Sequence, residues 1–370
     1  MMPTRHLPAA VLPRIVSGIQ PTGIPHIGNY FGSLKQWLDI QNESTLRKQR
    51  TNERCAFKGQ NQKLFFVADL HALTVPVSAK LLRRRRLEML AMLLAIGIDP
   101  KKSILFIQSD VPQHCEFMWL LACNTSMGSL NRMTQWKSKT QFRETDFASF
   151  LNLDEATSGR LKLGLFAYPV LQAADIILYR GTHVPIGKDQ VQHLELTRTI
   201  ANSINNILKK PVLNPPQPIL NYYSSIMALR RPTKKMSKSD DNTENYILLT
   251  DTASIIARKI SRALTDSISG ITYDRINRPG ISNLLAILSA TTGKDITSLS
   301  SSFADASHVE LKATVAEAVT QCLGPISERF QRYLGDIDYL NTVAKEGAEQ
   351  ATFIANSELL KLKKMLGLCF

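Results

Sequence analysis

Two short segments of the chain contain the residue types that a nucleoside triphosphate would need. The first runs from Ser17 to Tyr30 and reads SGIQPTGIPHIGNY. Its glycines let the backbone approach a ligand closely, and a helix is expected to begin near His26. A helix N-terminus presents backbone N–H groups and the positive end of a dipole, which suits phosphate, and the side chains of His26 and Asn29 add donors.

The second segment covers residues 234–240 and reads KKMSKSD. Lys235 and Lys238 lie three positions apart, in a loop that can close two cations on a polyphosphate. A lone match of this length is equally typical of a solvated surface loop. The two segments together, in this order, favour nucleotide chemistry, although the spacing of the first matches neither the Rossmann dinucleotide motif nor a P-loop.

The elements around these segments predict a parallel sheet. Short apolar runs alternate with stretches of helical periodicity, which is typical of βαβ units. Strands are expected at residues 14–19, 64–68, 103–108 and 183–186, helices at 28–41, 78–97, 163–179 and 188–206, and a proline-rich connector at 211–218.

From residue 251 onward the strand signal disappears, and helical patterns remain at 253–264, 281–292, 309–333 and 339–366. We therefore predict an α/β protein with a Rossmann-like parallel-sheet catalytic domain over 14–245, followed by an all-helical domain over 246–370. Residues 44–63 contain six basic residues against one acid and show no apolar periodicity, so we expect a basic loop insertion there.

Composition indicates a partner with many negative charges. The 370 residues include 45 Lys and Arg against 31 Asp and Glu, a formal net charge of +14, which favours nucleic acid or nucleotides. The hydrophobic content of 44% excludes a disordered chain, and the longest apolar run, Met89–Ile98, is too short to span a membrane. Five scattered cysteines without a C-x-x-C pair argue against a structural metal site.

The first thirteen residues resemble a short organellar leader. Arg5 and His6 lie there, and no acidic residue occurs before Asp39. A merely disordered N-terminal tail is the alternative. We expect a mitochondrial matrix location, with the cytoplasm as second choice, and a possible leader at residues 1–13.

The combined motifs resemble a known family, the class I aminoacyl-tRNA synthetases, which carry a His-Ile-Gly-His-like motif and a Lys-Met-Ser-Lys-Ser loop. The chain looks most similar to tryptophanyl-tRNA synthetases of mitochondrial type. Besides SGIQPTG, the resemblance is carried by VADLH at 67–71, YPVLQAAD at 168–175, VPIGKDQ at 184–190 and PGISNL at 279–284.

The resemblance implies two steps. The carboxylate of L-tryptophan attacks the α-phosphate of ATP, and tryptophan then passes to the terminal adenosine of tRNA(Trp). It also implies Mg²⁺ bound with ATP, a homodimer, and a helical domain that binds the tRNA and its anticodon. The attacking group belongs to the substrate, so the protein must supply alignment and charge neutralisation. No membrane contact and no protein-bound metal are expected.

Residue roles follow from the resemblance at matching positions. The predicted catalytic residues are His26, Asn29, Lys235 and Lys238. The predicted ATP-binding residues are Gln20, Pro21, Thr22, Gly28, Asn29, Gly187, Lys188, Asp189, Ile226, Lys235, Met236, Ser237, Lys238 and Ser239. The predicted tryptophan-binding residues are Asp175, Tyr168, Gln172 and Gln190.

Asp175 is the most informative acid, because it lies among alanines and isoleucines, where an unpaired carboxylate would be costly. It is either a structural acid paired inside the fold or the acceptor for the indole N–H of tryptophan. For the second case we expect an alanine substitution to leave thermal stability almost unchanged. His71 either packs near the pocket or is a satisfied core histidine.

Two departures from the family and three rival functions stay open. Lys188 stands where the family usually has Glu, which puts the role of that side chain in doubt. The 44–63 insertion looks longer than the usual connection, and either touches RNA or is a neutral surface insertion. The rivals are a tyrosyl-tRNA synthetase, a small nucleotidyltransferase with the same helix-start motif, which would not need the helical tail, and a catalytically inactive RNA-binding paralogue.

Overall fold

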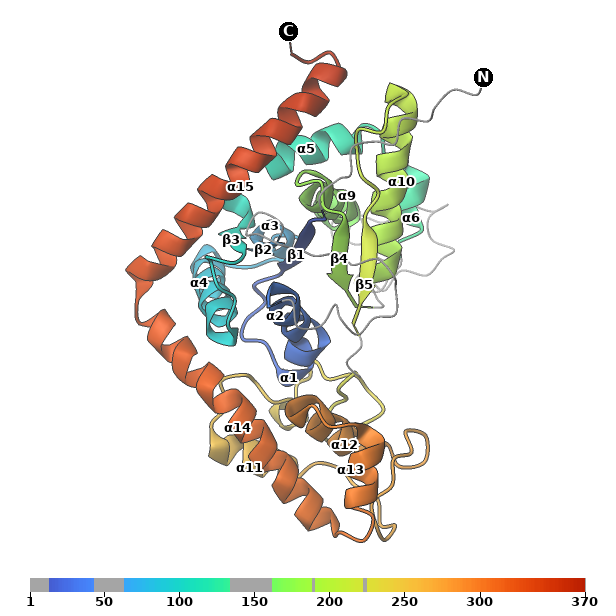
Figure 1. Cartoon of the computed structure of the whole chain (residues 1–370), viewed down its shortest axis with the longest axis vertical. Coiled ribbons are helices and arrows are strands. Elements are labelled where there is room, and N and C mark those ends of the chain that lie inside the picture. Colours follow the sequence, from blue (N-terminus) through green and yellow to red (C-terminus); the bar gives the residue numbers. More distant parts are fainter. Residues whose placement is uncertain (1–12, 43–62, 134–161, 188–189, 222–224, 370) are drawn as a thin grey trace, which may run out of the picture.

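The computed structural model describes residues 13–42, 63–133, 162–187, 190–221 and 225–369. Its centre is a five-stranded parallel sheet with strand order β3-β2-β1-β4-β5 (Figure 1). The strands are β1 (Ile15–Ile19), β2 (Lys63–Val67), β3 (Ile104–Ile107), β4 (His183–Ile186) and β5 (Gln217–Leu220). The predicted α/β fold with a parallel sheet is confirmed.

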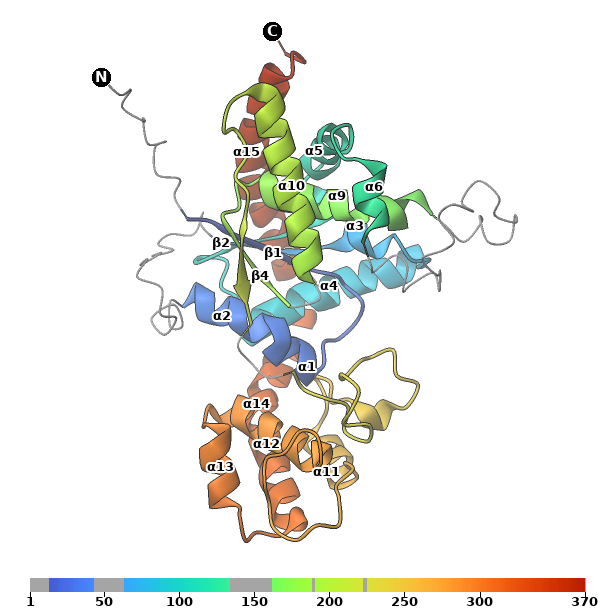
Figure 2. The same ribbon diagram turned by 90° about the vertical axis from the view of Figure 1, so that its right-hand side faces the viewer.

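The three strands β1, β2 and β3 are buried on both faces, as expected of apolar runs in a parallel sheet. On one face, Ile15, Phe65 and Leu105 pack against helices α2 (Lys35–Gln41) and α4 (Ala79–Ile96). On the other face, Val16 and Phe106 pack against α5 (Gln113–Ala122), α9 (Leu163–Ile177) and α10 (Val191–Leu208), which Figure 2 shows on the side of the sheet away from α2.

Two sequence expectations were wrong in detail. The proline-rich connector at 211–218 ends in β5, which includes Pro218 and lies at the edge of the sheet, where a missing N–H is tolerated. Lys63, expected in the basic insertion, is the first residue of β2. Its buried Nζ donates to the Gln41 carbonyl at 3.0 Å. The rest of that insertion and residues 1–12 of the expected leader lie outside the described residues.

Several short helices had no clear pattern in the sequence. Besides α5, they are α3 (Asp69–Ala72), the 3₁₀ turn Gln108–Asp110, α6 (Met127–Asn131), the 3₁₀ turn Thr243–Asn245 and α13 (Ile296–Ser302). The helix expected at 28–41 is built from α1 (Ile27–Asn29), a π-helical turn at Tyr30–Leu34, and α2. π-Helical turns of this kind are frequent at functional sites.

Beyond residue 251 every regular element is helical within the described residues, as predicted. These helices are α11 (Ala253–Ser261), α12 (Pro279–Thr292), α13, α14 (His308–Leu334) and α15 (Ile337–Met365). Figure 1 shows α11 to α14 grouped below the sheet, while α15 runs back along it. At Gly347 this helix lies so close to β3 that a Cβ would be 1.8 Å from the Leu105 carbonyl oxygen. The edge strand is thereby covered. No described helix is long and apolar enough to cross a membrane.

Candidate active site

A cavity of about 260 Å³ opens at the carboxyl ends of β1 and β4, where the strand order of the sheet reverses. Open α/β sheets bind ligands at such a point. Glycine is required at Gly18 beside this cavity, because a Cβ there would lie 2.3 Å from the ring of Phe66. Six of the predicted site residues line the cavity together: Gln20, Tyr168, Gln172, Asp175, Gly187 and Gln190.

Asp175 projects from α9 and is 2% exposed. Its Oδ1 accepts hydrogen bonds from Gln108 Nε2 and His114 Nδ1, each at 2.7 Å, and its Oδ2 accepts one from His71 Nε2 at 2.8 Å. The acid is therefore paired inside the fold and also lines the cavity, so the two alternatives for this residue are compatible. His71 lines the cavity as well.

The hydrogen bonds keep this buried acid ionised. Burial by itself would raise the pKa of Asp175, but hydrogen bonds from His114 and His71, together with their charges, lower that pKa to about 2. An ionised carboxylate only accepts, so its three partners all donate. Two lone pairs of Oδ1 are engaged, whereas Oδ2 keeps one for a further donor.

The other predicted tryptophan-binding residues form a connected polar chain. Gln190 Oε1 accepts from Gln172 Nε2 at 3.4 Å and from His193 Nδ1 at 3.0 Å. The Nε2 atom of His193 in turn lies 3.1 Å from the Tyr168 hydroxyl, within hydrogen-bond distance. Burial raises the pKa of Tyr168 to about 12, so this hydroxyl keeps its proton at neutral pH.

At the other end of the site, His26 caps the first helix. Its Nδ1 accepts from the Asn29 backbone N–H at 3.2 Å, and Asn29 Oδ1 accepts from the His26 backbone N–H at 3.1 Å. The Ile27 N–H donates to the Ile247 carbonyl. Because these backbone groups are already paired, the expectation that the whole helix N-terminus presents open N–H groups to phosphate was wrong.

The cap instead fixes the orientation of the His26 imidazole, because Nδ1 is held by the Asn29 N–H. Burial, followed by the nearby charges of Lys238 and Lys235, lowers the pKa of His26 to about 4, so the ring is neutral at pH 7. Since Nδ1 accepts, the remaining proton is on Nε2, which is available as a donor. Gly28 makes room for this arrangement, because a Cβ there would lie 2.9 Å from the His26 ring.

The lysine loop closes on the first motif. Lys238 Nζ donates to the Gly23 carbonyl at 2.9 Å and to Thr22 Oγ1 at 3.3 Å. Burial, and then the charge of Arg85, lowers the pKa of Lys238 to about 8. Lys235, by contrast, is exposed. The turn from Gln20 to Gly23 thus leads from the cavity wall to the ammonium group of Lys238.

Met236 and Ile226, both expected near adenine, are buried neighbours. The Met236 N–H donates to the Ile226 carbonyl at 3.2 Å, and Met227 pairs with Lys235 across an antiparallel bridge. Asn283 of α12 binds the backbone of Met227 through two hydrogen bonds. Its Oδ1 accepts from the Met227 N–H at 2.8 Å and its Nδ2 donates to the Met227 carbonyl at 3.0 Å.

The remaining predicted ATP residues divide into two groups. Pro21 lies in the turn between Gln20 and Thr22, while the exposed Ser237 and Ser239 lie on the lysine loop, where the Ser239 N–H donates to Ser237 Oγ. Lys188 and Asp189 lie outside the described residues.

Comparisons with known proteins agree with this arrangement. The family model of class I tRNA synthetases for tryptophan and tyrosine (W and Y) matches residues 11–324. The mitochondrial tryptophan–tRNA ligase of Schizosaccharomyces pombe is 55% identical over 355 residues, which cover 96% of this chain and 95% of the relative. This chain belongs to the tryptophan–tRNA ligases.

Solved structures of this family share the fold. The tryptophanyl-tRNA synthetase of Mycoplasma pneumoniae superposes with a TM-score of 0.80 at 32% identity, covering 97% of this chain and 99% of that one. The Campylobacter jejuni enzyme, complexed with ADP and tryptophan, superposes with a TM-score of 0.74 at 30% identity, covering 96% and 100%. The tyrosine alternative receives no support from the close relatives, and class I membership implies ATP as a substrate.

Sequence reasoning missed four residues of this tryptophan–tRNA ligase site: Gln108, His114, His193 and Asn283. One signal could have found the first two. Gln108 directly follows β3, at the same edge of the sheet where β1 and β2 end, and His114 lies in the first turn of α5. Polar residues after neighbouring parallel strands converge on the ligand crevice.

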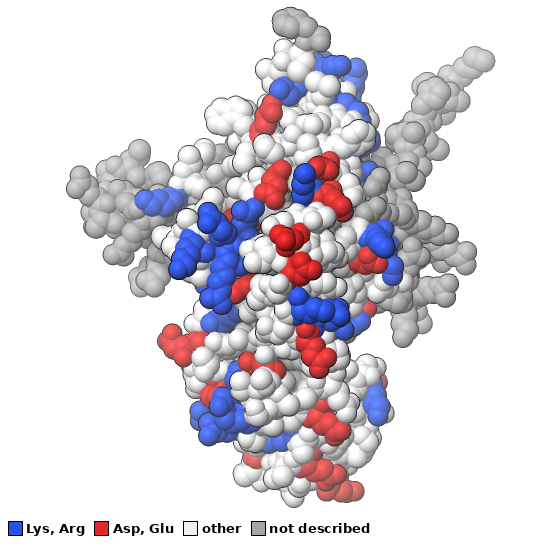
Figure 3. Space-filling view, turned by 90° about the vertical axis from the view of Figure 1, so that its left-hand side faces the viewer, with Lys and Arg blue, Asp and Glu red and all other residues white. Residues whose placement is uncertain are grey.

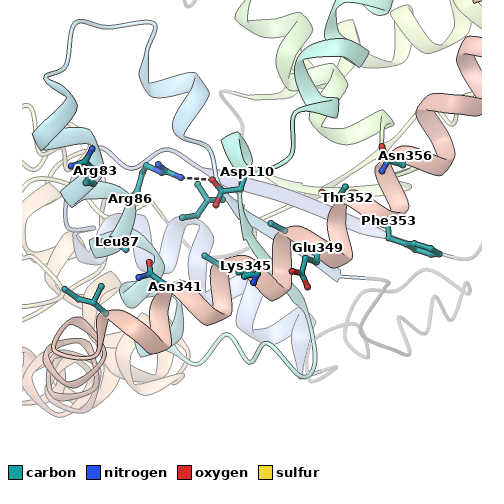
Figure 4. A pocket seen from close by; sticks show the side chains of 14 residues that line it. Arg83, Arg86, Leu87, Asp110, Asn341, Lys345, Glu349, Thr352, Phe353 and Asn356 are labelled. Carbon is teal, nitrogen blue, oxygen red and sulfur yellow. Dashed lines mark hydrogen bonds and ion pairs between the residues drawn. The ribbon is translucent and has the colours of Figure 1, made fainter.

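A second cavity, of about 910 Å³, lies between α4 and α15, away from the predicted site residues (Figure 4). Arg86 points into it, but the guanidinium is ion-paired with Asp110 at 2.9 Å and Asp69 at 2.8 Å. Figure 3 shows that basic and acidic side chains are intermixed on this face of the molecule. None of the residues that line this cavity is a predicted ATP-binding or tryptophan-binding residue.

Proposed function

We propose that this chain activates L-tryptophan with ATP and then transfers it to tRNA(Trp). A carboxylate oxygen of tryptophan attacks the α-phosphorus, the bond to the bridging oxygen breaks, and pyrophosphate leaves with that electron pair. A hydroxyl of the terminal adenosine then attacks the acyl carbon and releases AMP. The observation that carries the proposal is the turn from Gln20 to Gly23, which joins the cavity that contains Asp175 to the half-buried ammonium group of Lys238.

At the amino-acid end, we assign the indole N–H to Asp175. Among the described residues, Oδ2 accepts only from His71, and both Asp175 and His71 line the cavity. Tyr168, Gln172 and Gln190 would hold the α-amino and carboxylate groups, because their polar atoms border the same cavity.

At the ATP end, the roles are alignment and charge neutralisation. His26 Nε2–H donates to phosphate as a neutral group, while Lys238 and Lys235 stabilise the charge that develops on the leaving pyrophosphate. Met236 and Ile226, which are buried neighbours in this structure, would pack next to adenine. Further contacts to ATP are assigned to Gln20, Pro21, Thr22, Gly28, Asn29, Gly187, Lys188, Asp189, Ser237 and Ser239.

Mg²⁺ would arrive with ATP as part of the substrate. Among the described residues there is no group of three or more His, Cys, Asp or Glu that could hold a metal ion. The ligands of the ion would therefore be phosphate oxygens and water, and its charge would add to that of the two lysines.

We further propose that residues 14–245 form the catalytic domain and that residues 246–370 bind the tRNA and its anticodon. The net charge of +14 supports a polyanionic partner. A homodimer is supported by apolar side chains exposed on α5, α6 and the start of α9: Trp119 is 69% exposed, Met127 59% and Leu163 78%.

A mitochondrial matrix location is supported by the leader-like N-terminus and by the name of the fission yeast relative. The full-length chain fused to a fluorescent protein at its C-terminus tests this location. Exclusion of the fusion from mitochondria would contradict the proposed location. The net positive charge would then be explained by tRNA binding alone.

Pyrophosphate exchange with each of the twenty amino acids tests the proposed reaction. We expect exchange with tryptophan and ATP, and transfer of tryptophan to tRNA(Trp) but not to tRNA(Tyr). Exchange driven by tyrosine would support the rival synthetase, and no exchange with any amino acid would support the inactive RNA-binding paralogue.

A further inference from the structure

The hydrogen bonds beneath Asp175 distinguish the two oxygens of this carboxylate. Oδ1 accepts from Gln108 and His114, both of which have no exposed surface and lie outside the lining of the cavity. Oδ2 accepts only from His71, which lines the cavity. Considering the described residues, Oδ2 can therefore accept one more hydrogen bond. Oδ2 is also the oxygen whose present partner, His71, lines the cavity.

The two donors beneath the acid are themselves fixed from behind. Gln108 Oε1 accepts from the Leu70 N–H at 3.2 Å, which sets the direction of the amide and leaves its Nε2 to donate to Asp175. His114 Nε2 lies 2.8 Å from the hydroxyl of Tyr179, a fully buried residue on the turn after α9. His114 is therefore held at both ring nitrogens, by the carboxylate at Nδ1 and by the Tyr179 hydroxyl at Nε2.

We infer that His114 and Gln108, with Tyr179 behind His114, are positioning residues for amino-acid selection. By occupying Oδ1 they prevent the carboxylate from rotating and from presenting two equivalent acceptors. The remaining lone pair of Oδ2 is then fixed in one position, where we expect it to accept a hydrogen bond from the indole N–H of tryptophan. A dry site with a fixed acceptor discriminates strongly against a side chain that lacks the matching donor. This inference rests on the proposed role of Asp175.

The test compares two amino acids that differ only at the ring nitrogen: tryptophan and its analogue with sulfur in that position. Pyrophosphate exchange is measured with the full chain as kcat/KM for each. We expect His114→Leu to lower the ratio of kcat/KM for tryptophan to kcat/KM for the analogue about tenfold, because kcat/KM for tryptophan falls while that for the analogue changes little. His114→Asn should restore most of the ratio, since the asparagine amide places a donor near the position of Nδ1.

Tyr179→Phe provides the variant that is least disruptive to folding, because it removes one oxygen from a residue that does not line the cavity. We expect a shift of about threefold in the same direction, with Tyr333→Phe in α14 as the matched control and melting curves on all preparations. A ratio that is unchanged in both His114→Leu and Tyr179→Phe, whether or not the two kcat/KM values fall together, would overturn the inference. If the unmodified chain itself fails to prefer tryptophan over the analogue, the proposed role of Asp175 is wrong instead.

Discussion

The amino-acid end and the ATP end of the candidate site are built in opposite ways. Around Asp175, three donors converge on a buried carboxylate before any ligand arrives. Around Lys238, the partners are a backbone carbonyl and a threonine hydroxyl, and the neighbouring Lys235 is exposed. A preformed, buried network suits selection of a substrate, whereas groups whose contacts strengthen as charge develops suit catalysis.

This difference predicts separable losses, of which the largest is at the ATP end. Lys238→Ala should lower kcat for tryptophan-dependent pyrophosphate exchange by about 10²–10³-fold, because a charge facing the leaving group is removed. The dissociation constant of tryptophan, measured without ATP, should change little. Lys234→Ala, an exposed lysine of the same loop, is the control. Turnover equal to that of the unmodified chain would remove the loop from the mechanism.

Asp175→Ala should reduce kcat/KM for tryptophan by up to about a hundredfold, and much less for the sulfur analogue. The structure changes the expected effect on stability. Because His71, His114 and Gln108 would all lose their acceptor, we expect the free energy of unfolding to fall by roughly 3–5 kcal/mol instead of staying constant. Chemical denaturation of the two proteins measures this difference. A variant as stable as the parent would show that these donors find other partners.

A smaller effect is expected where the helical region supports the lysine loop. Asn283→Ala removes both hydrogen bonds to the Met227 backbone, so the bridge between Met227 and Lys235 is less well held. We expect KM for ATP to rise about tenfold while KM for tryptophan stays within about twofold. Asn277→Ala, at an exposed position of the same region, should change neither constant. Equal increases for the two substrates would indicate general loosening of the fold.

The smallest predicted effect is on pH dependence. The pKa of Lys238 is lowered to about 8, so this group loses its charge as the pH rises through that value in the free enzyme. Activity measured as kcat/KM for ATP should therefore decline above about pH 8. Lys238→Arg keeps its charge at higher pH and should move the alkaline decline upward by at least one unit. An unchanged profile would assign the decline to another group.

The sequence predicted the frame of the molecule well and its buried connections poorly. Apolar runs located β1 to β4 because these strands are buried on both faces. It missed β5, because Pro218 is typical of a connector and is tolerated here at the edge of the sheet. It placed Lys63 in a loop because the buried position of its ammonium group depends on a distant carbonyl.

The same distinction holds within the site. Asp175, His26 and Lys238 were predicted because each lies in a sequence motif that its own residue type and its neighbours in the chain define. No motif named His114 or Asn283, whose partners lie 61 and 56 positions away in the chain. The side-chain cap on His26, which occupies N–H groups that were expected to be open, also required the observed geometry.

The most direct test of this division of roles measures both ends in two variants at once. Lys238→Ala and Asp175→Asn are compared for tryptophan binding without ATP and for kcat of pyrophosphate exchange at saturating tryptophan. We expect Lys238→Ala to bind tryptophan like the parent and to turn over slowly, and Asp175→Asn to bind tryptophan at least tenfold more weakly. If Asp175→Asn binds tryptophan normally, or if Lys238→Ala loses tryptophan binding as well, then selection and catalysis are not divided between these two ends.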